Sequence, residues 1–191
     1  MKLYDISQEV FSCAVYPGDP APRREVLCSM EGGDLYNLTA FSMCAHNGTH
    51  MDAPAHFLQG GKTVEQIPLE KCIGTCLVAA HQGDLTGEDA EHLLSAGEKR
   101  ILLKGNAVVT LGAAEVFARA GLYLLGVESQ TVGPEDAPMA VHKVLLAAET
   151  VLLEGIRLGD VPAGKYLLMA QPLALGGADG APCRAVLGKM E

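Results

Sequence analysis

Three histidines and an aspartate lie within eleven residues of this chain: His46, His50, Asp52 and His56. Neutral imidazole and carboxylate groups are the usual protein ligands of Zn²⁺, Mn²⁺ and Fe²⁺ where thiolates are absent. A single histidine in such a sequence is more often a hydrogen-bonded core or surface residue than a ligand. Four candidate ligands in so short a segment favour a divalent metal site.

The residues between these side chains favour extended backbone over helix. In an extended strand His50 and Asp52 project from the same face, because successive side chains alternate. Gly48 allows a bend that brings His46 to the same side, and Pro54 disfavours helix at the residue before it. The segment therefore differs from the helical His-Glu-x-x-His motif of metalloproteases, which is absent from the sequence.

Hydrophobic periodicity and turn residues predict the elements that must position this segment. Strands are predicted at 3–6, 36–44, 73–80, 100–103, 122–127, 150–154 and 165–173, and helices at 86–96, 113–120 and 138–148. The order begins with strands and then alternates strand with helix. This order predicts an α/β fold with some parallel pairing in the second half of the chain.

Bulk composition restricts the class of protein. The chain has 191 residues, of which 49% are hydrophobic and 19% charged, which predicts a single globular domain over residues 1–191. A net charge of −9 argues against a nucleic-acid partner. The N-terminus has no signal-peptide pattern, and no apolar run approaches the ~20 residues of a membrane span. We therefore expect a cytoplasmic protein with no membrane partner, whose six scattered cysteines are reduced and buried.

The stretch from His46 to Phe57 resembles the H-x-G-T-H-x-D-x-P-x-H-F signature of the metal-dependent cyclase family, which includes bacterial kynurenine formamidase. The resemblance extends over nearly the whole chain. Further matching segments are 16–19, 126–132, the pair His142 and Glu154, and 178–187. Membership implies a three-layered, swivelling β/β/α fold with a mixed sheet.

The resemblance also implies a set of metal ligands. His46, His50, Asp52 and Glu154 match the ligands of a first ion, and Asp52, His142 and Glu154 match those of a second, so that the two carboxylates bridge. The expected cofactor is one or two Zn²⁺ ions, with Mn²⁺ as an alternative. The residues alone leave His142 as a polar position on an amphipathic helix and Glu154 as a carboxylate at a strand end.

The resemblance implies hydrolysis of a small amide of the arylformamidase, or N-formylkynurenine, type. Metal-bound hydroxide would attack the carbonyl, with His56 as the acid/base and Tyr16 against the substrate. Alternatives are a cyclic amide or lactone hydrolase, a cyclase or dehydratase, and a non-catalytic metal-binding protein. His56 argues against the last, since a purely structural site has little use for an additional unliganded base.

The resemblance further implies a small-molecule substrate and a homodimer or homotetramer, in which the early loop completes a neighbour's pocket. Three positions depart from the pattern of kynurenine formamidase. Tyr16 replaces a tryptophan, Glu128 replaces an aspartate, and Gly133 stands where a second aspartate is common. These departures concern the expected substrate side, so the reaction class is better supported than the particular substrate.

Overall fold

One mixed sheet of nine strands dominates the computed structural model, which describes residues 1–189. Across the sheet the strands are β1 (Lys2–Asp5), β13 (Val186–Lys189), β11 (Gly164–Met169), β5 (Ile73–Ala80), β7 (Arg100–Lys104), β9 (Leu124–Val127), β10 (Val151–Glu154), β4 (His50–Asp52) and β12 (Gly180–Pro182). The central strands β5, β7, β9 and β10 pair in parallel, and the strands on both flanks pair antiparallel.

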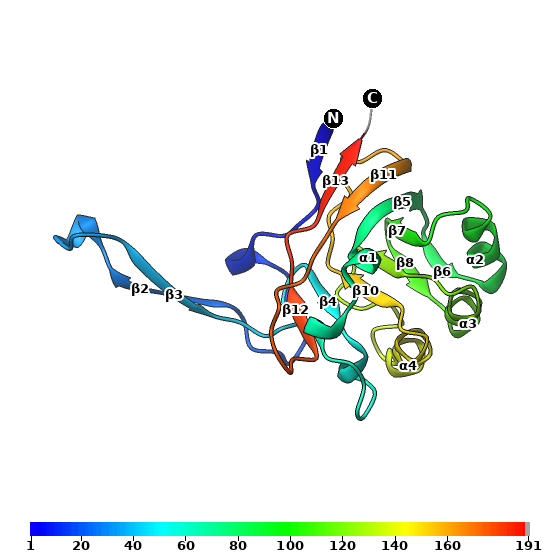
Figure 1. The fold of residues 1–191 in the computed structure, drawn as a ribbon, viewed down its shortest axis with the longest axis horizontal. Helices are drawn as coiled ribbons and strands as arrows, with labels where there is room; N and C mark the ends of the chain where they lie inside the picture. Colours follow the sequence, from blue (N-terminus) through cyan, green and yellow to red (C-terminus); the bar gives the residue numbers. More distant parts are fainter. Residues whose placement is uncertain (190–191) are drawn as a thin grey trace.

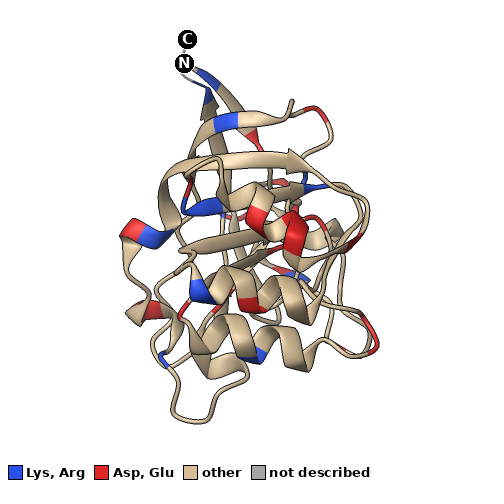
Figure 2. Ribbon diagram, turned by 90° about the vertical axis from the view of Figure 1, so that its right-hand side faces the viewer, with Lys and Arg blue, Asp and Glu red and all other residues tan. Residues whose placement is uncertain are grey.

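Three helices cover one face of this sheet (Figure 1). They are α2 (Gly87–Leu94), α3 (Leu111–Arg119) and α4 (Met139–Ala147), while α1 (Leu69–Cys72) is a single turn before β5. Thr86 and Thr110 cap α2 and α3 by accepting a backbone N–H in the first turn. Acidic and basic residues are interspersed along the helices of this layer (Figure 2).

Alternation along the strands divides the apolar side chains between two cores. Ile101 and Leu103 pack toward the helices, whereas Leu102 between them packs on the opposite face. The core on the opposite face joins Leu187 of β13 to Met51 of β4, although these strands lie near opposite ends of the sheet. The sheet therefore curls into two layers with the helices as a third, which confirms the expected α/β class and mixed β/β/α arrangement.

A hairpin arm, residues 23–42, projects from the body (Figure 1). Its strands β2 (Arg23–Cys28) and β3 (Leu38–Ser42) pair only with each other, with a β-bulge near the tip. A second small sheet pairs β6 (Gly83–Leu85) with β8 (Ala107–Val109) in parallel. Four 3₁₀ turns complete the fold: η1 (Val10–Ser12), η2 (Met30–Gly32), η3 (Pro54–His56) and η4 (Val64–Gln66).

Every strand and helix predicted from the sequence overlaps an observed element of the same type. The prediction missed β2, β6, β8, β12 and β13, which are short or too exposed to show an apolar pattern. The expectation of uniformly buried cysteines is wrong: all six are free, but Cys72 and Cys76 alone are fully buried. Among residues 1–189, no helix has the length and apolar character of a membrane span.

Candidate metal centre

Strand pairing and one helix bring four of the predicted ligands together. His50 and Asp52 lie two residues apart on β4, and Glu154 of β10 lies directly opposite His50 in the antiparallel register. Leu152, opposite Asp52, belongs to the core under the helices, so all of these side chains face that layer. Helix α4 packs on the same face and turns His142 inward.

Each of the two carboxylates points one oxygen at each of the two imidazoles. His50 Nε2 is 3.4 Å from Asp52 Oδ1 and 3.4 Å from Glu154 Oε2. His142 Nε2 is 3.2 Å from Glu154 Oε1 and 3.6 Å from Asp52 Oδ2. Asp52 and Glu154 therefore straddle both histidines, which is the arrangement a bridging pair of ligands requires.

Backbone hydrogen bonds fix which ring nitrogens face the carboxylates. His50 Nδ1 donates to Gly48 O at 3.0 Å, and His142 Nδ1 donates to Pro138 O at 2.8 Å. In the neutral form both Nε2 atoms then present lone pairs to carboxylate oxygens. Asp52 Oδ2 is buried without a hydrogen-bond partner among the described residues. A divalent cation between these groups would bind the Nε2 lone pairs and would pair with the unpartnered Asp52 oxygen. The residues present therefore fit a metal ion.

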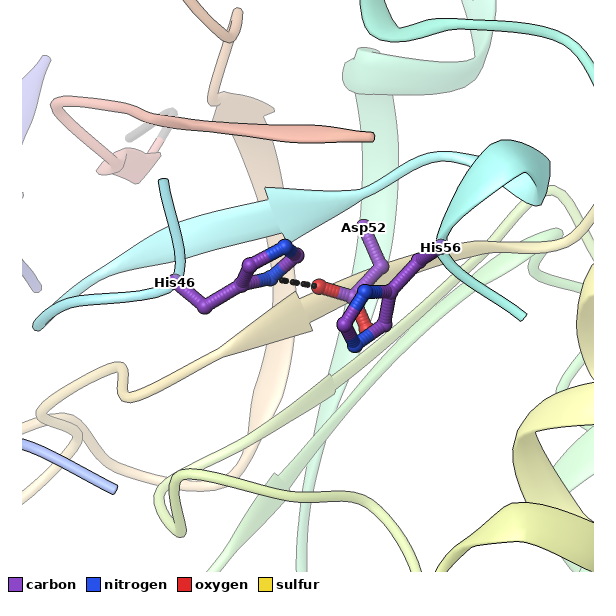
Figure 3. A group of neighbouring side chains, drawn as sticks. All are labelled: His46, Asp52 and His56. Atoms are coloured by element: carbon purple, nitrogen blue, oxygen red, sulfur yellow. Dashed lines mark hydrogen bonds and ion pairs between the residues drawn. The ribbon is translucent and has the colours of Figure 1, made fainter. Parts of the chain in front are cut away.

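His46 extends the cluster toward solvent. Its Nδ1 is 2.9 Å from Asp52 Oδ1 (Figure 3). Its Nε2 is 3.0 Å from Asp179 Oδ2. The ring lies against the backbone of β12: a Cβ on Gly180 would meet His46 Cε1 at 2.6 Å. Gly180 therefore lets β12 pair with β4 while the imidazole lies between them and the cavity.

His56, at the end of η3, faces the same group from its open side (Figure 3). Its ring stacks on His46 with centroids 4.0 Å apart, and its Nδ1 is 3.1 Å from Asp179 Oδ2. These side chains line a cavity of about 430 Å³, to which Tyr16 and Phe57 add aromatic rings. Tyr16 is held by a hydrogen bond from its hydroxyl to a backbone carbonyl, that of residue 135.

Burial and charge act in opposite directions on the titrating groups. Burial disfavours charged His50, but hydrogen bonds to Asp52 and Glu154 outweigh it and raise the pKa of His50 to about 10. The same balance raises the pKa values of His46 and His142. Burial alone would raise the pKa of Asp52, yet bonds to His46 and His50 hold it well below its usual range. The site strongly favours positive charge between its carboxylates.

Asp179 is the site residue whose role was not inferred from the sequence. The nearby Arg184 does not pair with it: Arg184 Nε donates to Asp5 Oδ2 at 2.9 Å. Asp179 instead contacts two histidines. In the sequence, Asp179 is marked only by its position in a glycine-rich stretch, 176–180, which does not have the pattern of a phosphate-binding loop.

Two of the residues that depart from the family pattern, Glu128 and Gly133, have structural roles. Both carboxylate oxygens of Glu128 accept backbone N–H groups, from Gly105 at 2.6 Å and from Leu158 at 2.8 Å. Gly133 is buried beside α4, where a Cβ would meet Val141 Cβ at 3.2 Å. Of the three departures, Tyr16 is therefore the one whose side chain lines the cavity.

The fold and the cluster define an α/β protein with a buried His/Asp/Glu site of the kind that holds divalent metals. A family model described as "Putative cyclase" matches residues 4–110. Kynurenine formamidase of Erythrobacter litoralis is 32% identical over 97% of this chain and 93% of that protein. Kynurenine formamidase of Salinibacter ruber is 35% identical over 98% and 97%, respectively. The chain belongs to the putative cyclase family.

A solved structure agrees with this assignment. A protein described as a potential metal-dependent hydrolase with cyclase activity matches with a TM-score of 0.85 and 30% sequence identity. The match covers 100% of this chain and 98% of that one. The family resemblance expected from the His46–Phe57 signature is confirmed.

Replacing Gly180 with Ala should weaken metal binding. The new methyl group would displace the His46 ring or the β4 backbone, because it would lie 2.6 Å from His46 Cε1 and 2.8 Å from Met51 O. We expect affinity for Zn²⁺ to fall about tenfold or more, as for other changes around a ligand, measured by competition with a chromophoric chelator. Gly176→Ala is the matched control, since no atom lies within 4 Å of its added Cβ. Equal affinity in both variants would refute the arrangement of His46.

Metal binding should release protons at pH 8. The pKa of His50 is about 10 in the metal-free protein, so its ring is protonated at pH 8, and a ligand must lose that proton. Affinity should therefore rise with pH up to about that pKa. Titration calorimetry in two buffers of different ionisation enthalpy should give different heats, and His50→Ala should reduce the difference while His92→Ala leaves it unchanged. Heats independent of buffer would contradict His50 as a ligand.

Proposed function

We propose that this protein is a metal-dependent hydrolase of a small aryl formamide of the N-formylkynurenine type. The observation that carries the proposal is the place of His56. Its ring lines the same cavity as Glu154 and forms no ion pair with Asp52 or Glu154, although one of its nitrogens lies within 4.8 Å of ligand atoms of His46 and Asp52. A histidine beside a metal cluster and outside its ligand set has the position of an acid/base. Two relatives named kynurenine formamidase support the choice of substrate.

We assign the metal to His50, Asp52, His142 and Glu154, which face one another across β4, β10 and α4, together with His46 from the turn before β4. A bound divalent ion supplies Lewis acidity, which makes water acidic near neutral pH and polarises a carbonyl oxygen. Imidazole and carboxylate ligands suit Zn²⁺, with Mn²⁺ as the second candidate. Asp52 and Glu154 each face both imidazoles, and this arrangement supports the proposal that a second ion can bind.

His56 is proposed to move the proton. Its Nδ1 faces Asp179, so Nε2 is the nitrogen free to take a proton from attacking water and return it to the leaving amine nitrogen. The side chain is about one-quarter exposed (26%), so it reaches the cavity without being freely hydrated. An imidazole can both accept and donate a proton, so one side chain can serve both steps.

The cavity supports an aryl substrate of modest size. Its volume of about 430 Å³ lies within the ~300–1,000 Å³ typical of small-molecule sites. Tyr16, Phe57 and Pro138 contribute apolar wall to this cavity, and the Phe57 ring packs against His56 and His142. Tyr16 would therefore contact the ring of the substrate, and the formyl group would point toward His56.

We further propose that the arm is covered by a second copy of this chain in a homo-oligomer, of which a dimer is the simplest. Half of the exposed large apolar side chains of residues 1–189 lie between residues 11 and 41, with Leu35 94% exposed at the arm's tip. A lone two-stranded hairpin is marginally stable in water. A groove of about 680 Å³ at its base, lined by Val10, Phe41 and Leu173, continues the apolar surface.

A location in the cytoplasm is also proposed. All six cysteines are free, which is typical of proteins in reducing compartments.

Zn²⁺-loaded protein should hydrolyse N-formylkynurenine faster than cyclic imides, lactones or other aryl amides. Replacing His56 with Ala should lower kcat by about 10²–10⁴-fold, the usual contribution of a positioned acid/base, with metal content unchanged by elemental analysis. His92→Ala is the control, because His92 is exposed on α2 away from the cavity. Full turnover in His56→Ala would refute the role of His56, and preference for a cyclic amide or lactone would replace the substrate proposal.

Charge on the arm should dissociate the oligomer. The double variant Leu35→Lys/Tyr36→Lys places two cations where both apolar side chains are exposed. Light scattering after size-exclusion chromatography should show a monomer at concentrations where the unmodified chain is a dimer. Leu111→Lys, at an exposed apolar site on α3 outside the arm, should leave the mass unchanged. A monomeric unmodified chain would overturn the proposal.

A further inference from the structure

One carboxylate oxygen serves two histidines that come from different segments of the chain. Asp179 Oδ2 is 3.0 Å from His46 Nε2 and 3.1 Å from His56 Nδ1. The two rings are stacked with an interplanar angle of 26°. Asp179 therefore contacts one proposed metal ligand and the proposed acid/base at once, through a single oxygen that faces one nitrogen of each stacked ring.

The backbone around Asp179 is fixed by strand pairing. Gly180, the next residue, begins β12 and pairs with Asp52 of β4. Ala53 N donates to Asp179 O at 2.9 Å, so the carbonyl of Asp179 is bound to the strand that carries the cluster. The preceding carbonyl, that of Ala178, accepts from Val64 N at 2.9 Å. The half-exposed carboxylate thus projects from a rigid backbone.

The chemistry of a carboxylate determines which nitrogens carry hydrogen. An ionised aspartate only accepts, so both ring nitrogens that face it must be N–H groups. His46 then keeps Nδ1, which faces Asp52, free of a proton and able to bind a cation. His56 keeps Nε2 free to exchange a proton. One hydrogen-bond acceptor selects the useful tautomer of both rings.

We propose that Asp179 is the positioning residue that holds His46 in its metal-binding orientation and His56 in its proton-transferring orientation. Asp179 itself binds neither the metal nor the substrate. The part that concerns His56 rests on the proposed hydrolase function, whereas the part that concerns His46 rests on metal binding alone. Carboxylates behind metal-bound histidines commonly act in this way.

The test compares Asp179→Ala with Asp179→Asn. Alanine removes the acceptor, and asparagine keeps an acceptor oxygen of the same size. In Asp179→Ala we expect affinity for Zn²⁺ to fall about tenfold, and kcat for N-formylkynurenine at saturating Zn²⁺ to fall at least tenfold with KM changed less than twofold. Asp179→Asn should recover most of both losses. Asp84→Ala, an exposed acid on β6, is the control and should match the unmodified chain.

A spectroscopic readout separates positioning from general destabilisation. In ¹⁵N-histidine correlation spectra of the Zn²⁺-loaded protein, His56 should be the Nδ1–H tautomer. It should shift toward the Nε2–H tautomer in Asp179→Ala and remain Nδ1–H in Asp179→Asn.

The outcomes are distinct. A changed KM with unchanged kcat would make Asp179 a substrate-binding residue and overturn the proposal, as would unaltered metal affinity and tautomer in Asp179→Ala. Complete loss of Zn²⁺ in both variants would make it a ligand and also overturn it. If the unmodified chain turns over no formamide, the hydrolase function has failed, while metal affinity and the His56 tautomer still decide the role of Asp179.

Discussion

The structure depends on two carboxylates that are buried on the helix-facing side of the sheet. Asp52 and Glu154 are 1% and 2% exposed, and burying charge is costly unless that charge is paired. Three imidazoles surround them, and Val132 N donates to Glu154 Oε1 at 2.8 Å. The short strand β4 lies between β10 and β12 in the sheet order, so the segment that carries His50 and Asp52 meets Glu154 on one neighbouring strand and Asp179 just before the other.

The backbone behind the cluster has little freedom. Gly155 follows Glu154 with φ of +68°, and a Cβ there would meet Gly48 O at 2.2 Å, so only glycine permits the approach. Gln8 Nε2 and Thr49 Oγ1 both donate to Gly155 O, at 2.7 and 2.8 Å. These bonds tie the N-terminal loop to the ends of β4 and β10. The candidate ligands on β4 and β10 are thus held by backbone contacts of residues that are not ligands themselves.

The sequence predicts well what is local and poorly what depends on distant pairing. Gly48 and Pro54 predicted that the His46–His56 segment is extended rather than α-helical; its centre is strand β4, whereas Pro54–His56 forms the 3₁₀ turn η3. His142 and Glu154 join the cluster through tertiary pairing, so family resemblance was needed to connect them. Asp179 was missed because β12 has three residues and no apolar pattern, and its partners lie more than a hundred residues earlier. The arm strand β2 was missed because it begins with charged residues and is solvent-exposed.

The charges of the site distinguish a first divalent ion from a second one between Asp52 and Glu154. With neutral histidines, Asp52 and Glu154 contribute two negative charges, which one divalent ion balances. A second divalent ion adds two positive charges in a buried setting, and the next carboxylate, Asp179, is half-exposed and already accepts from two imidazoles. The remaining compensation must come from an anion that enters the cavity, such as hydroxide or substrate. The charges of the fold itself would therefore balance a first ion, whereas a second would depend on an anion in the cavity.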